Sequence, residues 1–407
     1  MIPRGRLDIG WSDLLAGATS CLAPRGRDAM ERRVERLWSN EGDALICLSV
    51  RSGLDLLLTA LALPHGAEVL VSAITIRDMA RIVEHHGLVP VPVDLDMRTL
   101  TVKTDSLQRA LTSKTKALLV AHLFGSRMPL DEVAAYAREH GLFLIEDCAQ
   151  SFIGLEYRGD PASDVSMFSF GPIKTSSALG GALLRIRDAG LRSRMKALQS
   201  SWPVQGRWRF FKRVSRFFVL RVMLQRLPFT VLCGVCRLLD KSHDELISHS
   251  VRGFSGPDFF ANIRHQPSYP LMALLSRRLR RFEAARIVSR IGAAQTLLRG
   301  VPSLPRPGRD AAYHSYWTFP IQSESPDDLV RHLWLRGFDA TRGAWSLYCV
   351  PAPAGYPHLE ATDALETKRR IVYIPVYPEV ALHDLERLAE TLRELKIVGA
   401  GAGPVAA

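Results

Sequence analysis

Short apolar runs alternate with stretches of helical periodicity through the first half of the chain. Apolar runs bounded by turn residues predict buried strands, and the helical spacing between them predicts covering helices. Such an alternation builds βαβ units, so we predict an α/β fold with a mainly parallel sheet and helices on both faces. The predicted strands are residues 44–48, 68–71, 88–93, 116–121 and 142–145, and the predicted helices are 52–63, 77–86 and 130–140.

The run over residues 88–93 differs from the others because it contains Pro90 and Pro92. Proline has no N–H for the hydrogen-bond ladder of a sheet. We therefore expect this run at a sheet edge or in irregular structure.

The pattern changes in the second half. Residues 277–290 predict one long basic helix, and residues 301–308, with three prolines and a glycine, predict a linker. We therefore predict a large domain over residues 1–300, a small α+β domain over 309–396 and a disordered tail over 397–407.

Charge is concentrated in one segment. The formal net charge is +12, yet residues 189–239 hold eleven Lys or Arg and no Asp or Glu. A nucleic-acid-binding surface normally spreads its basic residues more widely, so we predict no nucleic-acid partner. We interpret residues of about 203–250 as a basic amphipathic insertion in the large domain.

Within this insertion, residues 207–226 predict a helix with two unlike faces. One face is cationic, and the opposite face carries aromatic and apolar side chains. Such a helix suits an anionic membrane surface, but it is equally typical of a helix that packs on its own domain or on a second subunit. The cationic face is Arg209, Lys212, Arg213 and Arg216; the other is Phe210, Phe211, Val214, Phe217 and Phe218.

The expected location is the cytoplasm, either free or peripheral at the inner face of the membrane. Six scattered cysteines in 407 residues indicate reduced thiols rather than a disulfide framework. We expect neither a signal peptide nor a membrane-spanning helix, because no apolar run has the required length and position.

Two positions indicate chemistry. Asp147 ends a predicted strand, and Lys174 follows a later strand in a turn rich in Gly, Pro and Ser. A lysine that forms a Schiff base and a carboxylate that keeps the ring nitrogen protonated are what pyridoxal phosphate (PLP) requires. Ser169 could then donate to the cofactor phosphate. The pattern alone also fits a helix-capping aspartate and a solvated turn lysine.

Several motifs that follow one another along the chain favour the PLP interpretation. The chain resembles the DegT/DnrJ/StrS sugar-aminotransferase family of fold-type I PLP enzymes, whose motifs read V-H-L-Y-G, E-D-x-A-Q, F-S-F-x-x-x-K and G-G. The corresponding residues here are 121–125 (AHLFG), 145–150 (IEDCAQ), 167–174 (MFSFGPIK) and 180–181 (GG), with further likeness at 49–54, 262–264 and 316–320.

This resemblance implies a set of cofactor-binding residues. Lys174 would be the Schiff-base lysine, Asp147 the partner of the pyridine nitrogen, and Gln150 a neighbour of the ring. Ser169, Arg51 and Ser52 would bind the phosphate, the last two at a helix start. Asn262 would reach the phosphate from the neighbouring subunit, which implies a homodimer with shared active sites.

Two positions depart from the family pattern. Ile76 stands where the family has an aromatic residue that stacks on the ring, and Val50 replaces a turn glycine. We expect Ile76 to cover the cofactor ring with an aliphatic side chain.

The resemblance implies an aminotransferase that moves an amino group, with glutamate as the expected donor, to a keto-sugar that is expected to be nucleotide-linked. Such a reaction belongs to amino-sugar, surface-polysaccharide or glycolipid biosynthesis. The alternative hypothesis is a catalytically reduced protein of the same fold that acts as a membrane-associated regulatory or assembly partner.

Overall fold

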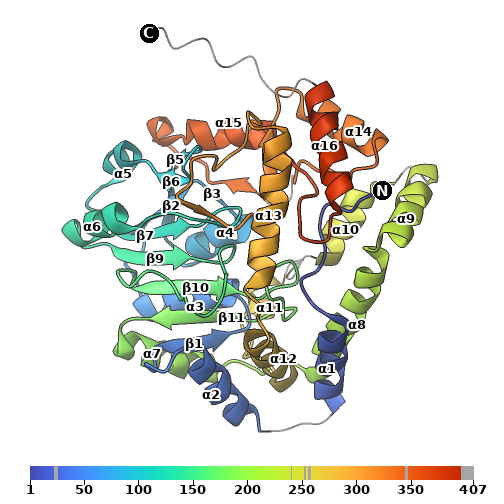
Figure 1. Ribbon diagram of the computed structural model, residues 1–407. Helices are drawn as coiled ribbons and strands as arrows, with labels where there is room; N and C mark the ends of the chain where they lie inside the picture. The colour runs from blue at the N-terminus through green and yellow to red at the C-terminus, as the bar shows by residue number, and fades with distance from the viewer. Residues whose placement is uncertain (23–25, 240, 252–253, 255–257, 344–346, 396–407) are drawn as a thin grey trace.

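A seven-stranded sheet forms the centre of the protein in a computed structural model that describes residues 1–22, 26–239, 241–251, 254, 258–343 and 347–395 (Figure 1). Neighbouring strands are parallel from β10 to β4, while β11 runs antiparallel to both of its neighbours. The prediction of a mainly parallel sheet is therefore confirmed. In spatial order the strands are β1 (Ala44–Cys47), β11 (Ala182–Ile186), β10 (Val165–Ser169), β9 (Phe143–Asp147), β7 (Thr115–Ala121), β2 (Glu68–Ser72) and β4 (Val89–Val93).

Helices cover both faces of this sheet because successive strand residues point to opposite sides. In β2, Val69 and Val71 pack in one core with α3, α4 and α7, whereas Leu70 packs on the other side with α5 and α6. Over β1, β10 and β11 that other side is covered by α1, α2 and α12. These helices are α1 (Trp11–Leu22), α2 (Arg27–Trp38), α3 (Val50–Leu61), α4 (Arg77–His85), α5 (Thr104–Ala110), α6 (Asp131–Glu139), α7 (Ala189–Ser200) and α12 (Tyr269–Arg280).

The proline-containing strand β4 lies at one edge of the sheet, as predicted. The single helix predicted over residues 277–290 is wrong: α12 ends at Arg280, and α13 (Ala285–Gly300) begins only after a break. Phe282 in the break packs its ring 5.1 Å from that of Phe152, in the core beneath α12. The chain thus leaves the helical path where this partly buried ring contacts the core.

A second core lies at the C-terminal end. Strands β13 (Pro320–Gln322) and β15 (Ile371–Tyr373) pair antiparallel and pack with α14 (Pro326–Leu335) and α16 (Leu382–Glu394). Ala294 and Leu297 of α13 belong to this core too. The division into domains at residues 300–309 stays a prediction, and the predicted tail over 397–407 lies outside the described residues.

Three further strand pairs lie outside the central sheet. The remaining strands pair as β3 (Ile74–Thr75) with β14 (Tyr348–Cys349), β5 (Leu95–Asp96) with β6 (Thr101–Val102), and β8 (Ser126–Arg127) with β12 (Tyr313–His314). Helix α15 (Thr362–Arg370) precedes β15.

The basic insertion forms α8 (Arg207–Met223), α9 (Arg226–Leu238) and α10 (His243–Val251), followed by the short α11 (Phe259–Ile263). Figure 1 shows α8 beside α1 along one edge of the molecule, with α9 continuing from it. Phe210, Val214 and Phe217 are buried in the core shared with α1 and α12. The structure therefore favours internal packing for most of the aromatic face, while Phe218 remains 49% exposed.

No single helix in the described part of the chain is long and apolar enough to cross a membrane. Helices α8 and α9 reach that length and composition only when taken together, across a 90° bend.

Candidate active site

Asp147 and Lys174 lie at the carboxyl end of the parallel strands, where α/β sheets bind ligands. Asp147 is the buried last residue of β9, and its Oδ1 accepts a hydrogen bond from the Ala149 amide at 2.9 Å. Nothing in the described residues donates to the other oxygen, Oδ2. Lys174 follows β10 in a turn closed by its own amide and the Gly171 carbonyl, at 3.0 Å.

The electrostatics of this pair favour a reactive amine. Burial lowers the pKa of Lys174 to about 8; the Asp147 carboxylate opposes this shift and the Arg51 guanidinium adds to it. Burial also raises the pKa of Asp147 above its usual range, against the Ala149 hydrogen bond and the charge of Lys174. Each group therefore lies within the electrostatic field of the other, and the predicted role of this pair at a cofactor stays a prediction.

Trp317 is a neighbour of Lys174 that the sequence did not identify. The Lys174 Nζ lies 4.1 Å from the centre of the Trp317 ring, and the indole N–H donates to the Ile173 carbonyl at 3.0 Å. Its only signal was membership of the motif at residues 316–320. The indole therefore lies directly beside the Lys174 amine.

The start of α3 supplies a place for a phosphate. Ser49 caps the helix by accepting from the Ser52 amide at 3.1 Å, and the two hydroxyls lie 2.9 Å apart. Val50 forms the first helical residue, so its replacement of glycine is compatible with an ordinary capped helix. Arg51 forms an ion pair with Asp78, 2.5 Å between Nε and Oδ2. The first backbone N–H groups of such a helix point outward and attract anions.

Ser169 lies at the end of β10, and its hydroxyl accepts from the Gly171 amide at 3.4 Å. Gln150 holds the neighbouring loop in place, because its Oε1 accepts from the Phe124 amide at 2.8 Å. Ile76 caps the start of α4, partly buried against the core that contains α3. Its predicted contact with the cofactor ring stays a prediction.

Asn262 lies on α11, where its Oδ1 accepts from Arg209 of α8 at 2.6 Å. Two residues later, Arg264 makes a bidentate ion pair with the buried Asp55 of α3, at 2.9 Å for each bond. Asn262 is therefore held beside α8 and α3 within one chain. Its predicted contact with the site of a second subunit is not tested.

A buried network lies behind Asp147. Glu146 accepts hydrogen bonds from Ser166, from Tyr157 and, at 2.8 Å, from His122. Burial opposes ionisation, but these donors hold the pKa of Glu146 below its usual value. The ligand atoms of His122, Glu146 and Cys148 lie within 4.8 Å of one another, yet burial raises the pKa of the Cys148 thiol well above its usual value. We interpret this group as a structural network that fixes the end of β9.

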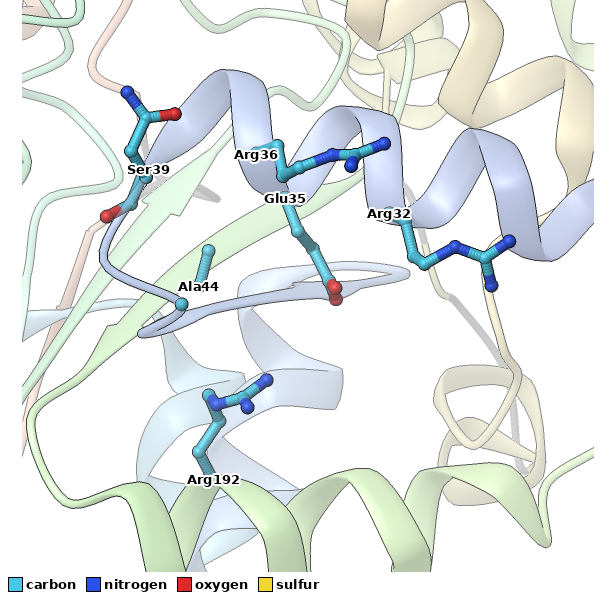
Figure 2. A pocket seen from close by; sticks show the side chains of 8 residues that line it. Arg32, Glu35, Arg36, Ser39, Ala44 and Arg192 are labelled. Carbon is cyan, nitrogen blue, oxygen red and sulfur yellow. The ribbon is translucent and has the colours of Figure 1, made fainter.

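A separate hollow is visible in Figure 2, between the end of α2, the start of β1 and α7. Its charged lining includes Arg32, Arg36, Arg192 and Glu35. It opens beside Ala44, at the opposite end of β1 from the start of α3, and is therefore distinct from the site of Lys174.

The residues present fit PLP. The free Asp147 oxygen suits a protonated ring nitrogen, Lys174 is a suitable amine, and the start of α3 with Ser169 suits a phosphate. Together with the mainly parallel sheet, these residues are consistent with the fold-type I architecture.

Comparisons with known proteins agree with this class. Residues 25–215 match the model of the DegT/DnrJ/EryC1/StrS aminotransferase family. A UDP-N-acetyl-3-dehydro-alpha-D-glucosamine 3-aminotransferase of Acidithiobacillus ferrooxidans is 34% identical over 205 residues, which is 49% of this chain and 55% of the relative. The match thus spans about half the length of that relative.

Solved structures show the same fold over nearly the whole chain. The aminotransferase TlmJ of Streptoalloteichus hindustanus superposes with a TM-score of 0.70 at 20% identity, covering 97% of this chain and 98% of its own. The PLP form of the putative sugar aminotransferase Spr1654 of Streptococcus pneumoniae superposes with a TM-score of 0.65 at 17% identity, covering 98% of each chain.

Proposed function

We propose that this protein is a PLP-dependent aminotransferase that transfers an amino group to a keto-sugar. The observation that carries this proposal is the pair formed by Lys174 and Asp147, each within the other's electrostatic field at the ligand-binding edge of the sheet. Nothing in the comparisons favours the alternative of a catalytically reduced regulatory partner.

The roles of the residues follow from their chemistry. Bound PLP supplies an electron sink for the negative charge left when a proton leaves the carbon that bears the amino group. Asp147 holds a proton on the ring nitrogen, and the Lys174 amine accepts and returns the substrate proton at Nζ. An amine with a pKa of about 8 is partly neutral at physiological pH, which this role requires.

The proposed acceptor is a nucleotide-linked keto-sugar, and the proposed donor is glutamate. Support comes from the Acidithiobacillus relative, whose name specifies a UDP-linked 3-dehydro sugar. The product would be an amino sugar of the kind used in polysaccharide or glycolipid synthesis.

The decisive experiment adds PLP to the purified chain and records the visible absorption of the bound cofactor. Borohydride should then fix the cofactor covalently on Lys174, located by peptide mass, and Lys174→Ala should abolish this labelling. Amino transfer is tested next with glutamate and a panel of keto-sugars, either free, nucleotide-linked or lipid-linked. A wild-type protein that takes up no PLP would overturn the proposal.

We further propose a homodimer in which Asn262 contributes to the site of the partner subunit. Subunit complementation tests this arrangement with Lys174→Ala and Asn262→Ala chains, each inactive or impaired alone. If sites are shared, a mixed dimer regains one intact site of two, and with it up to about half of the wild-type activity per dimer. Mixed dimers that stay as weak as the parents would contradict the shared arrangement.

The proposed location is the cytoplasm, at the inner face of the membrane, reached through residues 207–226 and the adjoining α9. Cations along α8 and exposed apolar side chains on α9, such as Leu227 and Val231 (79% and 65% exposed), support an anionic lipid surface as partner. The described cysteines are all free thiols, as in reducing compartments.

A further inference from the structure

Arg213 of the basic insertion points inward rather than along the exposed cationic face. It lies one turn after Arg209 on α8 and is partly buried, whereas Arg209, Lys212 and Arg216 are exposed. Its Nη1 would lie 3.4 Å from a Cβ atom placed on Gly180. The absence of a side chain at Gly180 therefore leaves room for this guanidinium against the backbone.

Backbone contacts connect this point to the start of α3. The Gly181 amide donates to the Leu48 carbonyl at 2.9 Å, directly before the helix cap at Ser49. Ser169 lies opposite Ala182 in the β10–β11 ladder, next to the same glycines. Arg213 thus approaches the place where Ser169 and the α3 N-terminus meet.

Arg51, the second residue of α3, also lies near this place. The guanidinium carbons of Arg51 and Arg213 each lie 6.0 Å from the centre of the Phe254 ring. Arg51 has a carboxylate partner in Asp78, but no carboxylate in the described residues lies within ion-pair distance of Arg213, and no described group accepts a hydrogen bond from it. The nearby charges that act on it, those of Arg209, Arg216 and Arg51, are all positive.

A cation that is packed among other cations and lacks a counterion is costly unless an anion joins it. Burial, followed by the charges of these three arginines, lowers the pKa of Arg213 to about 10. The helix start beside it adds the positive end of a helix dipole. A doubly charged phosphate group would satisfy both arginines and the free N–H groups at once.

We propose that Arg213, from the inserted helix α8, binds the phosphate group of the cofactor in the same chain, together with the N-terminus of α3, Ser169 and Arg51. This inference rests on the proposed function and extends it, because it gives the basic insertion a part in the cofactor site. A nucleotide substrate also carries phosphate, so the test separates the two sources.

The experiment measures PLP affinity by absorption titration for wild type, Arg213→Ala, Arg213→Lys and Arg216→Ala. Arg216 is the matched control, since it lies on the same helix and is exposed. Loss of a charge-assisted contact should weaken PLP binding about tenfold or more in Arg213→Ala, less in Arg213→Lys, and not measurably in Arg216→Ala. Equal affinities for Arg213→Ala and Arg216→Ala would overturn the proposal.

Two further arms separate binding from structure. Pyridoxal lacks the phosphate, so wild type and Arg213→Ala should bind it equally; a similar loss for pyridoxal would show a merely structural role and overturn the proposal. Weakened binding of UDP with unchanged binding of PLP would assign Arg213 to the substrate instead, and would overturn it as well.

A final arm keeps this test independent of the proposed function. Inorganic phosphate should raise the melting temperature of cofactor-free wild type more than that of Arg213→Ala. If wild type takes up no PLP yet shows this difference, the phosphate site stands and the aminotransferase assignment fails. If the two proteins respond equally to phosphate, the site itself is refuted.

Discussion

Opposing effects act on the pKa of the Lys174 amine. Burial and Arg51 disfavour its charged form, whereas Asp147 favours it. The balance leaves an amine that can be neutral near physiological pH and can still regain a proton. An exposed lysine, with an ordinary pKa of about 10.4, would be almost wholly charged under the same conditions.

This balance predicts a pH dependence. In cofactor-free protein, the rate at which an amine-selective reagent modifies Lys174 should rise with pH around a midpoint of about 8. Arg51→Ala removes a cation that lowers the pKa, so the midpoint should move upward by roughly half a unit to one unit. Peptide mass mapping across a pH series gives the rate at this residue, and Arg216→Ala serves as the control. An unchanged midpoint in Arg51→Ala would contradict the electrostatic account.

The buried carboxylate of Asp147 should lower the free energy of unfolding, although the proposed function requires it. Burial raises the pKa of this carboxyl in the folded state. The protonated carboxyl therefore contributes to the free energy of unfolding below the unfolded pKa of about 3.9, and this contribution is lost as the pH rises through the folded pKa. Asp147→Asn should therefore stabilise the cofactor-free protein at pH 7 by about 1 kcal/mol while it weakens PLP binding. Thermal melts at pH 7 and pH 3.5 test this, since the gain should vanish at the lower pH. A destabilised variant at pH 7 would refute the sign.

At the scale of helices and strands, the local sequence pattern was sufficient to predict an element whose burial is determined by its own residues. The strands were predictable because β1, β2, β7 and β9 are short apolar runs buried on both faces. The break between α12 and α13 could not be predicted in this way, because Phe282 in the break packs against Phe152, which is distant in the sequence.

The residues of the candidate site can also be divided into those that the local sequence predicts and those that depend on packing. Asp147 and Lys174 were predictable because their strands end beside one another in any parallel sheet of this order. Arg213 could not be distinguished from Arg209, Lys212 or Arg216 by spacing, since only the position of Gly180 shows which arginine turns inward. Trp317 lies in the C-terminal part, and its approach to Lys174 depends on how that part packs.

The packing of α8 gives a prediction at this scale. Phe217 is 2% exposed in the core shared with α1 and α12, whereas its neighbour Phe218 is 49% exposed. Phe217→Ala should lower the free energy of unfolding by about 3–5 kcal/mol, because it leaves a cavity, and Phe218→Ala should cost about 1 kcal/mol or less. Chemical denaturation of both variants provides the comparison. Equal, small losses would show that α8 is not anchored in this core.

Over the whole molecule, most of the apolar surface of the insertion lies on α9 rather than on α8. Leu227, Val231, Val235 and Leu238 are 46–88% exposed and recur at spacings of three or four residues along that helix. They therefore form a row on one side of α9. Two basic residues, Arg226 and Arg237, lie on α9 itself, and Arg226 also forms an ion pair with Asp384 at 2.9 Å. The proposed membrane-binding surface is thus an apolar row along α9, with a basic residue towards each end of that helix.

Liposome flotation tests this arrangement. Wild type should float with vesicles that contain anionic lipid and much less with neutral vesicles, because each Lys or Arg near an anionic surface contributes about 1 kcal/mol. Replacing Leu227, Val231 and Val235 with Ser should abolish most of the flotation. The matched control replaces Leu335 and Leu382, which are 66% and 60% exposed outside the insertion, with Ser and should float like wild type. If the α9 variant floats equally well, the membrane assignment is wrong; if it converts a dimer to a monomer in sedimentation while flotation is unchanged, the row is a subunit interface.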